Sequence, residues 1–173
     1  TAVTELTISN NTVKNCKIGI SSYGGTGQFS ITGNTIIDST TADGSVGIRF
    51  ATYTTGPIIN GNSIQGAKTG IYQLDYGGYS YANIYGNSIY NTSTATNGSN
   101  CGGKSTTQSV GICTNPAYLT AVGNLISGYN YGVISSGSPS FGTGHAHGNN
   151  FVNVTTAFSD ENTGMDGGLS GST

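Results

Sequence analysis

The chain has 173 residues, of which only 7% are charged, and its formal net charge is −2. Its five Lys and Arg residues are scattered, so no basic stripe predicts a nucleic-acid partner. No apolar run of the sequence approaches the roughly 20 residues that a membrane-spanning helix needs, so no membrane partner is expected. The abundance of Gly, Ser, Thr and Asn favours a protein of the extracellular space or of a virion surface.

A block of the form apolar-x-Gly-Asn-x-apolar recurs along the chain. Its six copies lie at residues 8–13, 31–36, 59–64, 84–89, 121–126 and 146–151. The first copy has Asn in place of Gly, and the last two are weaker matches. The central asparagines are Asn11, Asn34, Asn62, Asn87, Asn124 and Asn149, separated by 23, 28, 25, 37 and 25 residues. A repeat of this period indicates a solenoid.

A second block, a small residue followed by a larger apolar one, lies downstream of each asparagine. Its copies are Gly19-Ile20, Gly47-Ile48, Gly70-Ile71, Gly111-Ile112, Gly132-Val133 and Ala157-Phe158. The offset from the asparagine is 8 residues in four copies and 13 and 24 in the other two. Insertions of 5 and 16 residues are therefore expected at the same connection, in the second and fourth coils.

Together the two blocks predict an all-β, single-stranded right-handed parallel β-helix of about six coils over residues 1–158. The first and last positions of the block are expected to stack as inward columns, because one coil alone cannot bury its apolar face. The asparagines are expected to form a hydrogen-bonded ladder at a turn, where Asn tolerates a left-handed conformation. Residues 159–173 are expected to be a Gly- and Ser-rich tail in contact with a neighbouring subunit.

These blocks resemble the right-handed parallel β-helix superfamily, which includes pectate lyases and related polysaccharide lyases, alginate epimerases and bacteriophage tailspikes. The resemblance covers residues 6–158 and supports the fold. It also implies a polysaccharide-processing enzyme, which we keep as an alternative because the repeat records scaffold geometry only.

The three cysteines have different expected places. Cys16 lies five residues after its asparagine, in an inward column, and is predicted to be a small core residue. Cys101 lies in the 16-residue insertion, and Cys113 is expected on the outward side of a strand. A Cys101–Cys113 disulfide would pin the insertion in an oxidising compartment, and two free thiols are the alternative.

A candidate carbohydrate site lies between the two insertions. Lys68, on the third coil, is expected to point outward between them, and Arg49 and Tyr72 are expected to share an outward column. With Asp43 near the first insertion, these residues would line a trough that suits a glycan. The alternative is that the insertions only cover the rod or contact a neighbour.

Catalytic and metal-binding residues are not assigned. The acids, among them Asp38 and Asp43, show neither the facing carboxylates of a glycosidase nor the acid cluster with adjacent Arg and Lys of a pectate lyase. His145 and His147 are expected on the outer face of one strand, with no third metal ligand evident. We therefore predict no enzymatic activity, no metal and no cofactor.

The two ends of the repeat carry the main functional hypothesis. Neither end is capped by its own sequence, so either the chain was cut from a longer protein or other copies cover its ends. We predict a structural or adhesive protein that associates with itself, end to end or as a trimer, in a surface filament or a viral tail fibre or spike. A polysaccharide lyase, hydrolase or epimerase, or a carbohydrate-binding module, is the alternative, and glycans are the other candidate partners.

Overall fold

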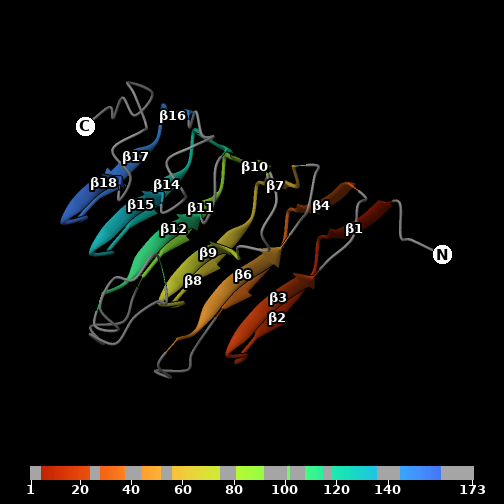
Figure 1. Ribbon diagram of the computed structural model, residues 1–173. Coiled ribbons are helices and arrows are strands. Elements are labelled where there is room, and N and C mark those ends of the chain that lie inside the picture. The colour runs from red at the N-terminus through yellow and green to blue at the C-terminus, as the bar shows by residue number, and fades with distance from the viewer. Residues whose placement is uncertain are drawn as a thin grey trace.

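The computed structural model describes residues 5–23, 28–37, 44–51, 56–74, 81–91, 101, 108–114, 118–135 and 145–160. Within these ranges the regular structure is β-strand throughout, so nothing there provides a helix that could cross a membrane. The strands form three parallel sheets of six strands each, stacked in chain order along a rod (Figure 1). The predicted β-solenoid class is confirmed.

Each coil contributes one strand to each sheet. Sheet A contains β1 (Glu5–Ser9), β4 (Gln28–Thr32), β7 (Ile58–Asn60), β10 (Tyr81–Tyr85), β13 (Tyr118–Val122) and β16 (His145–His147). Sheet B contains β2 (Thr12–Lys14), β5 (Thr35–Ile37), β8 (Ser63–Gln65), β11 (Ser88–Tyr90), β14 (Leu125–Ser127) and β17 (Asn150–Val152). Sheet C contains β3 (Ile18–Tyr23), β6 (Val46–Ala51), β9 (Thr69–Gln73), β12 (Val110–Thr114), β15 (Tyr131–Ser135) and β18 (Thr156–Asp160).

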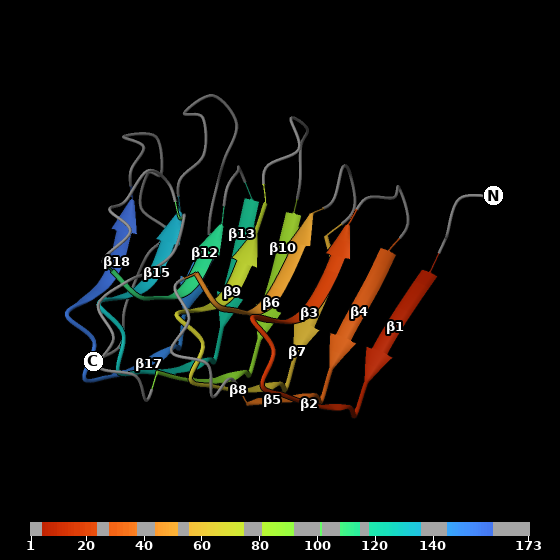
Figure 2. The same ribbon diagram turned by 90° about the horizontal axis from the view of Figure 1, so that it is seen from below.

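The short strands of sheet B connect the two longer sheets along the rod (Figure 2). Of the about six coils expected, four are described without a gap, at residues 5–23, 56–74, 118–135 and 145–160, and two are described in part. In the other two turns the gap falls between β5 and β6 and between β11 and β12, the connection where the sequence places the insertions. Strand β18 ends at Asp160, two residues beyond the predicted boundary, and residues 161–173 of the expected tail lie outside the described residues.

The predicted inward columns are confirmed in register. In sheet A the column consists of Ile8, Ile31, Ile59, Ile84, Ala121 and Ala146. In sheet B it consists of Val13, Ile36, Ile64, Ile89, Ile126 and Phe151. A third column, which was not among those predicted, lies in sheet C and consists of Ile20, Ile48, Ile71, Ile112, Val133 and Phe158. The interior members belong to one apolar core, which runs the length of the rod and drives the stacking of the coils.

The predicted asparagine ladder is also present. Each of the first five block asparagines donates from Nδ2 to the Oδ1 of the asparagine in the next coil, at distances between 2.9 and 3.1 Å. The ladder runs without a break through Asn11, Asn34, Asn62, Asn87, Asn124 and Asn149. All but Asn11 are buried, and each buried amide has acceptors, as burial of a polar group requires.

The residue that adopts the left-handed conformation in the turn is not the one expected. The ladder asparagines do not have positive φ; the residue before each of them does, as at Gly33 (φ 65°) and Gly61 (φ 63°). In the first coil this position is Asn10, with φ 57°. Glycine adopts this conformation without a steric cost, and Asn is the residue that most readily replaces it there. The ladder asparagine is therefore selected for its amide, and the glycine for the turn.

The glycine of the second block is required by close packing. A Cβ on Gly111 would lie 2.5 Å from Ile126 Cγ2 and 2.7 Å from the carbonyl oxygen of Gly132. No side chain fits at such a distance, so the glycines let sheet C pass close to the isoleucine column of sheet B.

Replacing Ile64 with Asp should destabilise the rod by more than about 3 kcal/mol, because the carboxylate would be buried without a partner in the central column. Gln65→Asp, at the next residue of β8, should leave the melting temperature nearly unchanged, because Gln65 is exposed. Thermal melts of the two variants check the register, which equal losses of stability would contradict.

Candidate functional site

The outer face of sheet C brings together a cation and two tyrosines. Arg49 on β6 is the register partner of Tyr72 on β9, so their predicted outward column is confirmed. On the other side, the hydroxyl of Ser21 on β3 accepts hydrogen bonds from Arg49 Nε and Nη2, both at 3.3 Å. The Cζ atom of Arg49 lies 4.8 Å from the centroid of the Tyr23 ring, which is a cation–π contact. We call Tyr23, Arg49 and Tyr72 the Tyr–Arg–Tyr cluster.

The three strands that carry this cluster contribute one charged residue, Arg49. Burial raises the pKa of Tyr72, and Tyr23 raises it further, while Arg49 lowers it. The Tyr72 phenol therefore stays protonated near neutral pH and carries no charge that would neutralise Arg49. The strands β3, β6 and β9 contain no acidic residue. Asp43, the acid expected beside this face, lies outside the described residues.

The exposure predicted for Lys68 is wrong. Lys68 precedes β9 at the connection from which the insertions emerge, but its side chain is fully buried. Its backbone N–H donates to Ser45 Oγ at 3.1 Å, whereas its Nζ has no hydrogen-bond partner in the described part of the chain. The register of the repeat had suggested that Lys68 is solvent-accessible. Because its side chain is buried, it cannot contact a glycan at the surface.

The predicted disulfide is present between Cys101 and Cys113. Cys113 lies on the outer side of β12, in register with Tyr72 and Ile134. Cys101, Val110, Cys113 and Ile134 are fully buried together, with Tyr72 and Tyr131 packed against them. This disulfide cluster is a second small core outside the rod, and it forms one wall beside the Tyr–Arg–Tyr cluster.

The core position predicted for Cys16 is wrong, because Cys16 is a free and exposed thiol. The equivalent positions of interior coils do point inward, since Ala67 and Tyr129 are buried. Cys16 belongs to the first coil, so no earlier coil among the described residues covers it.

Tyr129 was not singled out from the sequence. It lies five residues after its asparagine, as Cys16 and Ala67 do, but its ring is far larger than their side chains. Its hydroxyl donates to the carbonyl oxygen of Ala67, two coils away, at 2.9 Å. The sequence did contain a signal for this contact: Tyr129 is a large residue at a position that small residues occupy in earlier coils, so its side chain has to extend beyond its own coil.

Neither a catalytic pair nor a metal cluster emerges from the described residues. The described acids, Glu5 on β1 and Asp160 on β18, belong to strands at opposite ends of the rod. His145 and His147 are exposed on β16, as expected, with the buried Ala146 between them. No group of three or more His, Cys, Asp or Glu side chains in this part of the chain is arranged to hold a metal.

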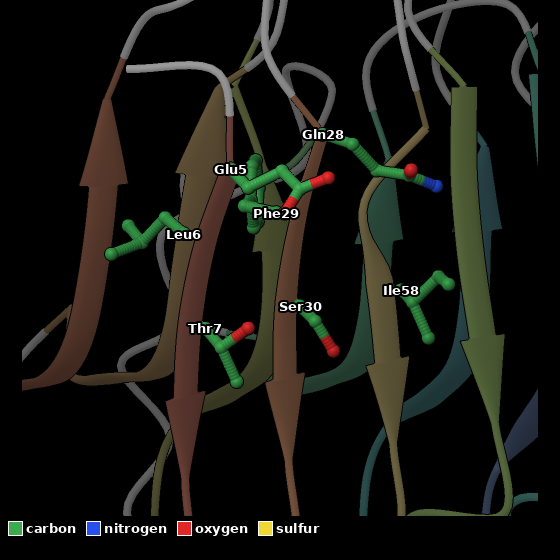
Figure 3. A pocket seen from close by; sticks show the side chains of 7 residues that line it. All are labelled: Glu5, Leu6, Thr7, Gln28, Phe29, Ser30 and Ile58. Carbon is green, nitrogen blue, oxygen red and sulfur yellow. The ribbon is translucent and has the colours of Figure 1, made fainter.

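A shallow hollow of about 170 Å³ lies over β1, β4 and β7, lined by Glu5, Leu6, Thr7, Gln28, Phe29, Ser30 and Ile58 (Figure 3). Ligand pockets usually measure about 300–1,000 Å³. The hollow has one charged residue, Glu5, and lies at the free edge of sheet A, so its lining contains no pair of facing acids.

Comparison with protein families matches residues 1–108 to the family described as periplasmic copper-binding protein (NosD). This is a right-handed β-helix family with the pectate-lyase-like fold, in agreement with the resemblance of the repeats. Comparison with curated proteins found no match, and neither did comparison with solved structures.

We expect Lys68→Met to leave the stability within about 1 kcal/mol of the wild type or to raise it, because the buried ammonium has no hydrogen-bond partner to lose. Lys68→Asp should lower it by more than about 3 kcal/mol, since a shorter charged group would be buried there. Chemical denaturation measures both values. A neutral effect of Lys68→Asp would mean that Lys68 is exposed after all.

Cys16 should react with a thiol reagent in the native protein, because it is exposed, whereas Cys101 and Cys113 should react only after reduction. Mass spectrometry of labelled peptides gives the modified positions, and mapping without reductant should recover Cys101 and Cys113 as one cross-linked species. Labelling of Cys101 or Cys113 in the native, unreduced protein would contradict the disulfide.

Proposed function

Because the chain belongs to the NosD family of periplasmic copper-binding proteins, we propose that it is an exported, non-enzymatic β-solenoid that assembles end to end with copies of itself. The proposal combines the location in the family description with the geometry of the two ends of the rod. The proposed assembly is a filament; the family description gives a periplasmic protein and by itself supports neither a filament nor a viral tail fibre.

Export is supported by the cysteine chemistry. The Cys101–Cys113 disulfide is fully buried in its own small core. Structural disulfides persist in the periplasm and outside the cell, where the environment is oxidising, and are rare in the cytosol. The low charge and the abundance of Ser, Thr and Asn agree with this location.

The residues of this chain do not fit a copper site of the kind the family description implies. Copper in proteins is held by thiolate, thioether and imidazole ligands. The matched residues 1–108 contain no His and no Met, and Cys101 is in the disulfide, which leaves Cys16 as the remaining thiol. The chain's two histidines, His145 and His147, lie beyond the matched residues. We therefore derive no role for copper from this structure.

A non-enzymatic role is supported by the arrangement of the acids and the cavities. Among the described residues the acids, Glu5 and Asp160, belong to strands at opposite ends of the rod, and the hollow over sheet A is smaller than a usual ligand pocket. A polysaccharide-processing enzyme remains the alternative that the fold suggests, and turnover of acidic and neutral polysaccharides separates the two.

End-to-end assembly is supported by the strand edges. In the described part of the chain, β1, β2 and β3 each pair on one side only, and so do β16, β17 and β18 at the other end. An edge strand presents N–H and C=O groups that another strand can bind. All strands of a sheet run in the same direction, so the last coil of one copy can pair in parallel with the first coil of the next.

The apolar columns are incomplete at the same ends, and this observation carries the proposal. Leu6 is 41% exposed and Val13 is half-buried in the first coil, although their partners Phe29 and Ile36 in the second coil are buried. In the last coil, Phe151 and Phe158 are only partly buried and pack edge to face on each other, with centroids 5.0 Å apart. A stacked copy would cover both ends at once, and a head-to-tail contact that does not close gives a filament.

Leu6→Lys should weaken assembly at least about tenfold, because stacking would bury the new ammonium, while the exposed position should spare the fold. Thr7→Lys is the matched control, since Thr7 is exposed on the same strand and lies outside the inward column. Sedimentation velocity over a concentration series and electron microscopy measure assembly, and thermal melts check folding. A stable wild-type monomer at high concentration, or assembly of Leu6→Lys equal to the control, would overturn the proposal.

A further inference from the structure

Arg49 carries a positive charge that the described residues leave unneutralised. Its guanidinium is partly buried against Tyr23 and hydrogen-bonded to one hydroxyl, that of Ser21. A guanidinium has five N–H donors, and two of its nitrogens, Nε and Nη2, share that single acceptor. The strands on either side contribute Ser21 and Tyr72, neither of which is an anion. A partly desolvated cation without a counter-charge has unused capacity to bind an anion.

The surroundings hold this cation in place. The Tyr23 ring and the Ser21 hydroxyl fix the plane of the guanidinium from the side of β3, and Tyr72 borders it from β9. Tyr72 is itself held by the disulfide cluster. An ordered side chain loses less conformational entropy when a ligand binds, so the cluster is organised before binding.

The shape of the surface suits an extended ligand. Tyr23, Arg49 and Tyr72 lie on three consecutive strands of sheet C, which span about 10 Å along the rod at the usual strand spacing. Tyr23 is 48% exposed and offers a flat apolar ring beside the guanidinium. The planar guanidinium of Arg binds two oxygens of a carboxylate or sulfate group through two parallel hydrogen bonds, and an aromatic ring packs against the apolar face of a sugar.

From this geometry we propose that the Tyr–Arg–Tyr cluster binds an anionic saccharide through a carboxylate or sulfate group. The site differs from the trough expected from the sequence, because Lys68 is buried and Tyr23 takes its place. Arg49 and Tyr72 lie on interior strands of sheet C, whereas Tyr23 lies on β3, an end strand, so a stacked copy would lie beside the cluster without covering its outer face.

Isothermal titration calorimetry with three oligosaccharide probes tests the site: oligogalacturonate, which is carboxylated, a heparin-derived oligosaccharide, which is sulfated, and neutral maltohexaose. The wild type should bind at least one of the anionic probes, more weakly as salt increases, and should not bind maltohexaose. Binding of the carboxylated or of the sulfated probe alone would support the site and identify the group that it recognises.

Arg49→Gln should lower the affinity at least about tenfold, and Arg49→Lys several-fold, because lysine keeps the charge without the planar fork. Tyr23→Ala should also weaken binding. The matched control is Lys17→Gln, which removes the same charge from an exposed residue just before β3. Equal melting temperatures verify that the variants fold.

Three results would overturn the proposal: no binding of either anionic probe, equal binding of maltohexaose, or unchanged affinity in Arg49→Gln. Calorimetry measures saccharide binding, and sedimentation measures self-association. Failure of the saccharide-binding proposal is therefore distinguishable from failure of the assembly proposal.

Discussion

Each interior asparagine of the ladder holds three coils together with one amide group. Asn62 Nδ2 donates to the carbonyl oxygen of Ile31 in the preceding coil at 2.9 Å and to Asn87 Oδ1 in the next coil at 2.9 Å. Its backbone N–H also donates to Asn87 Oδ1, at 2.9 Å. These groups are buried, so a slip of one residue in any coil would leave amides without partners, at a cost of about 1–3 kcal/mol each. The ladder therefore fixes the register of all three sheets.

The fixed register determines what gathers on the outside of the rod. The sequence places both insertions at the connection between sheets B and C, between β5 and β6 and between β11 and β12. The disulfide cluster covers the outer side of β12, and the Tyr–Arg–Tyr cluster lies beside it on β3, β6 and β9. The repetitive scaffold thus places Arg49, which has no counter-charge among the described residues, next to the disulfide cluster.

The inward columns were predictable because the spacing of the block encodes them directly. Which residue has positive φ could also have been inferred, since glycine at that position is replaced by Asn10, the residue type that tolerates it. The exposure of Lys68 and Cys16 was not predictable from the register, because it depends on what covers each coil. Lys68 belongs to an interior coil of the rod, whereas Cys16 belongs to an end coil.

The Tyr–Arg–Tyr cluster was predicted only in part. Arg49 and Tyr72 occupy equivalent positions in consecutive coils, so the repeat places them side by side. Tyr23 lies two positions further along its strand than Ser21, the register partner of Arg49, and reaches the guanidinium because the arginine side chain is long. Such a diagonal contact depends on side-chain conformation, which the spacing of a repeat does not encode.

Native-state hydrogen exchange of the ladder amides tests the central constraint most directly. The backbone N–H groups of Asn62 and Asn87 each donate to the amide oxygen of the next coil, so both should exchange only through global unfolding and with the same free energy. The N–H of Asn11, in the exposed first coil, should exchange faster. Rapid exchange of Asn62 and Asn87, well below the free energy of global unfolding, would contradict a ladder that holds the coils in register.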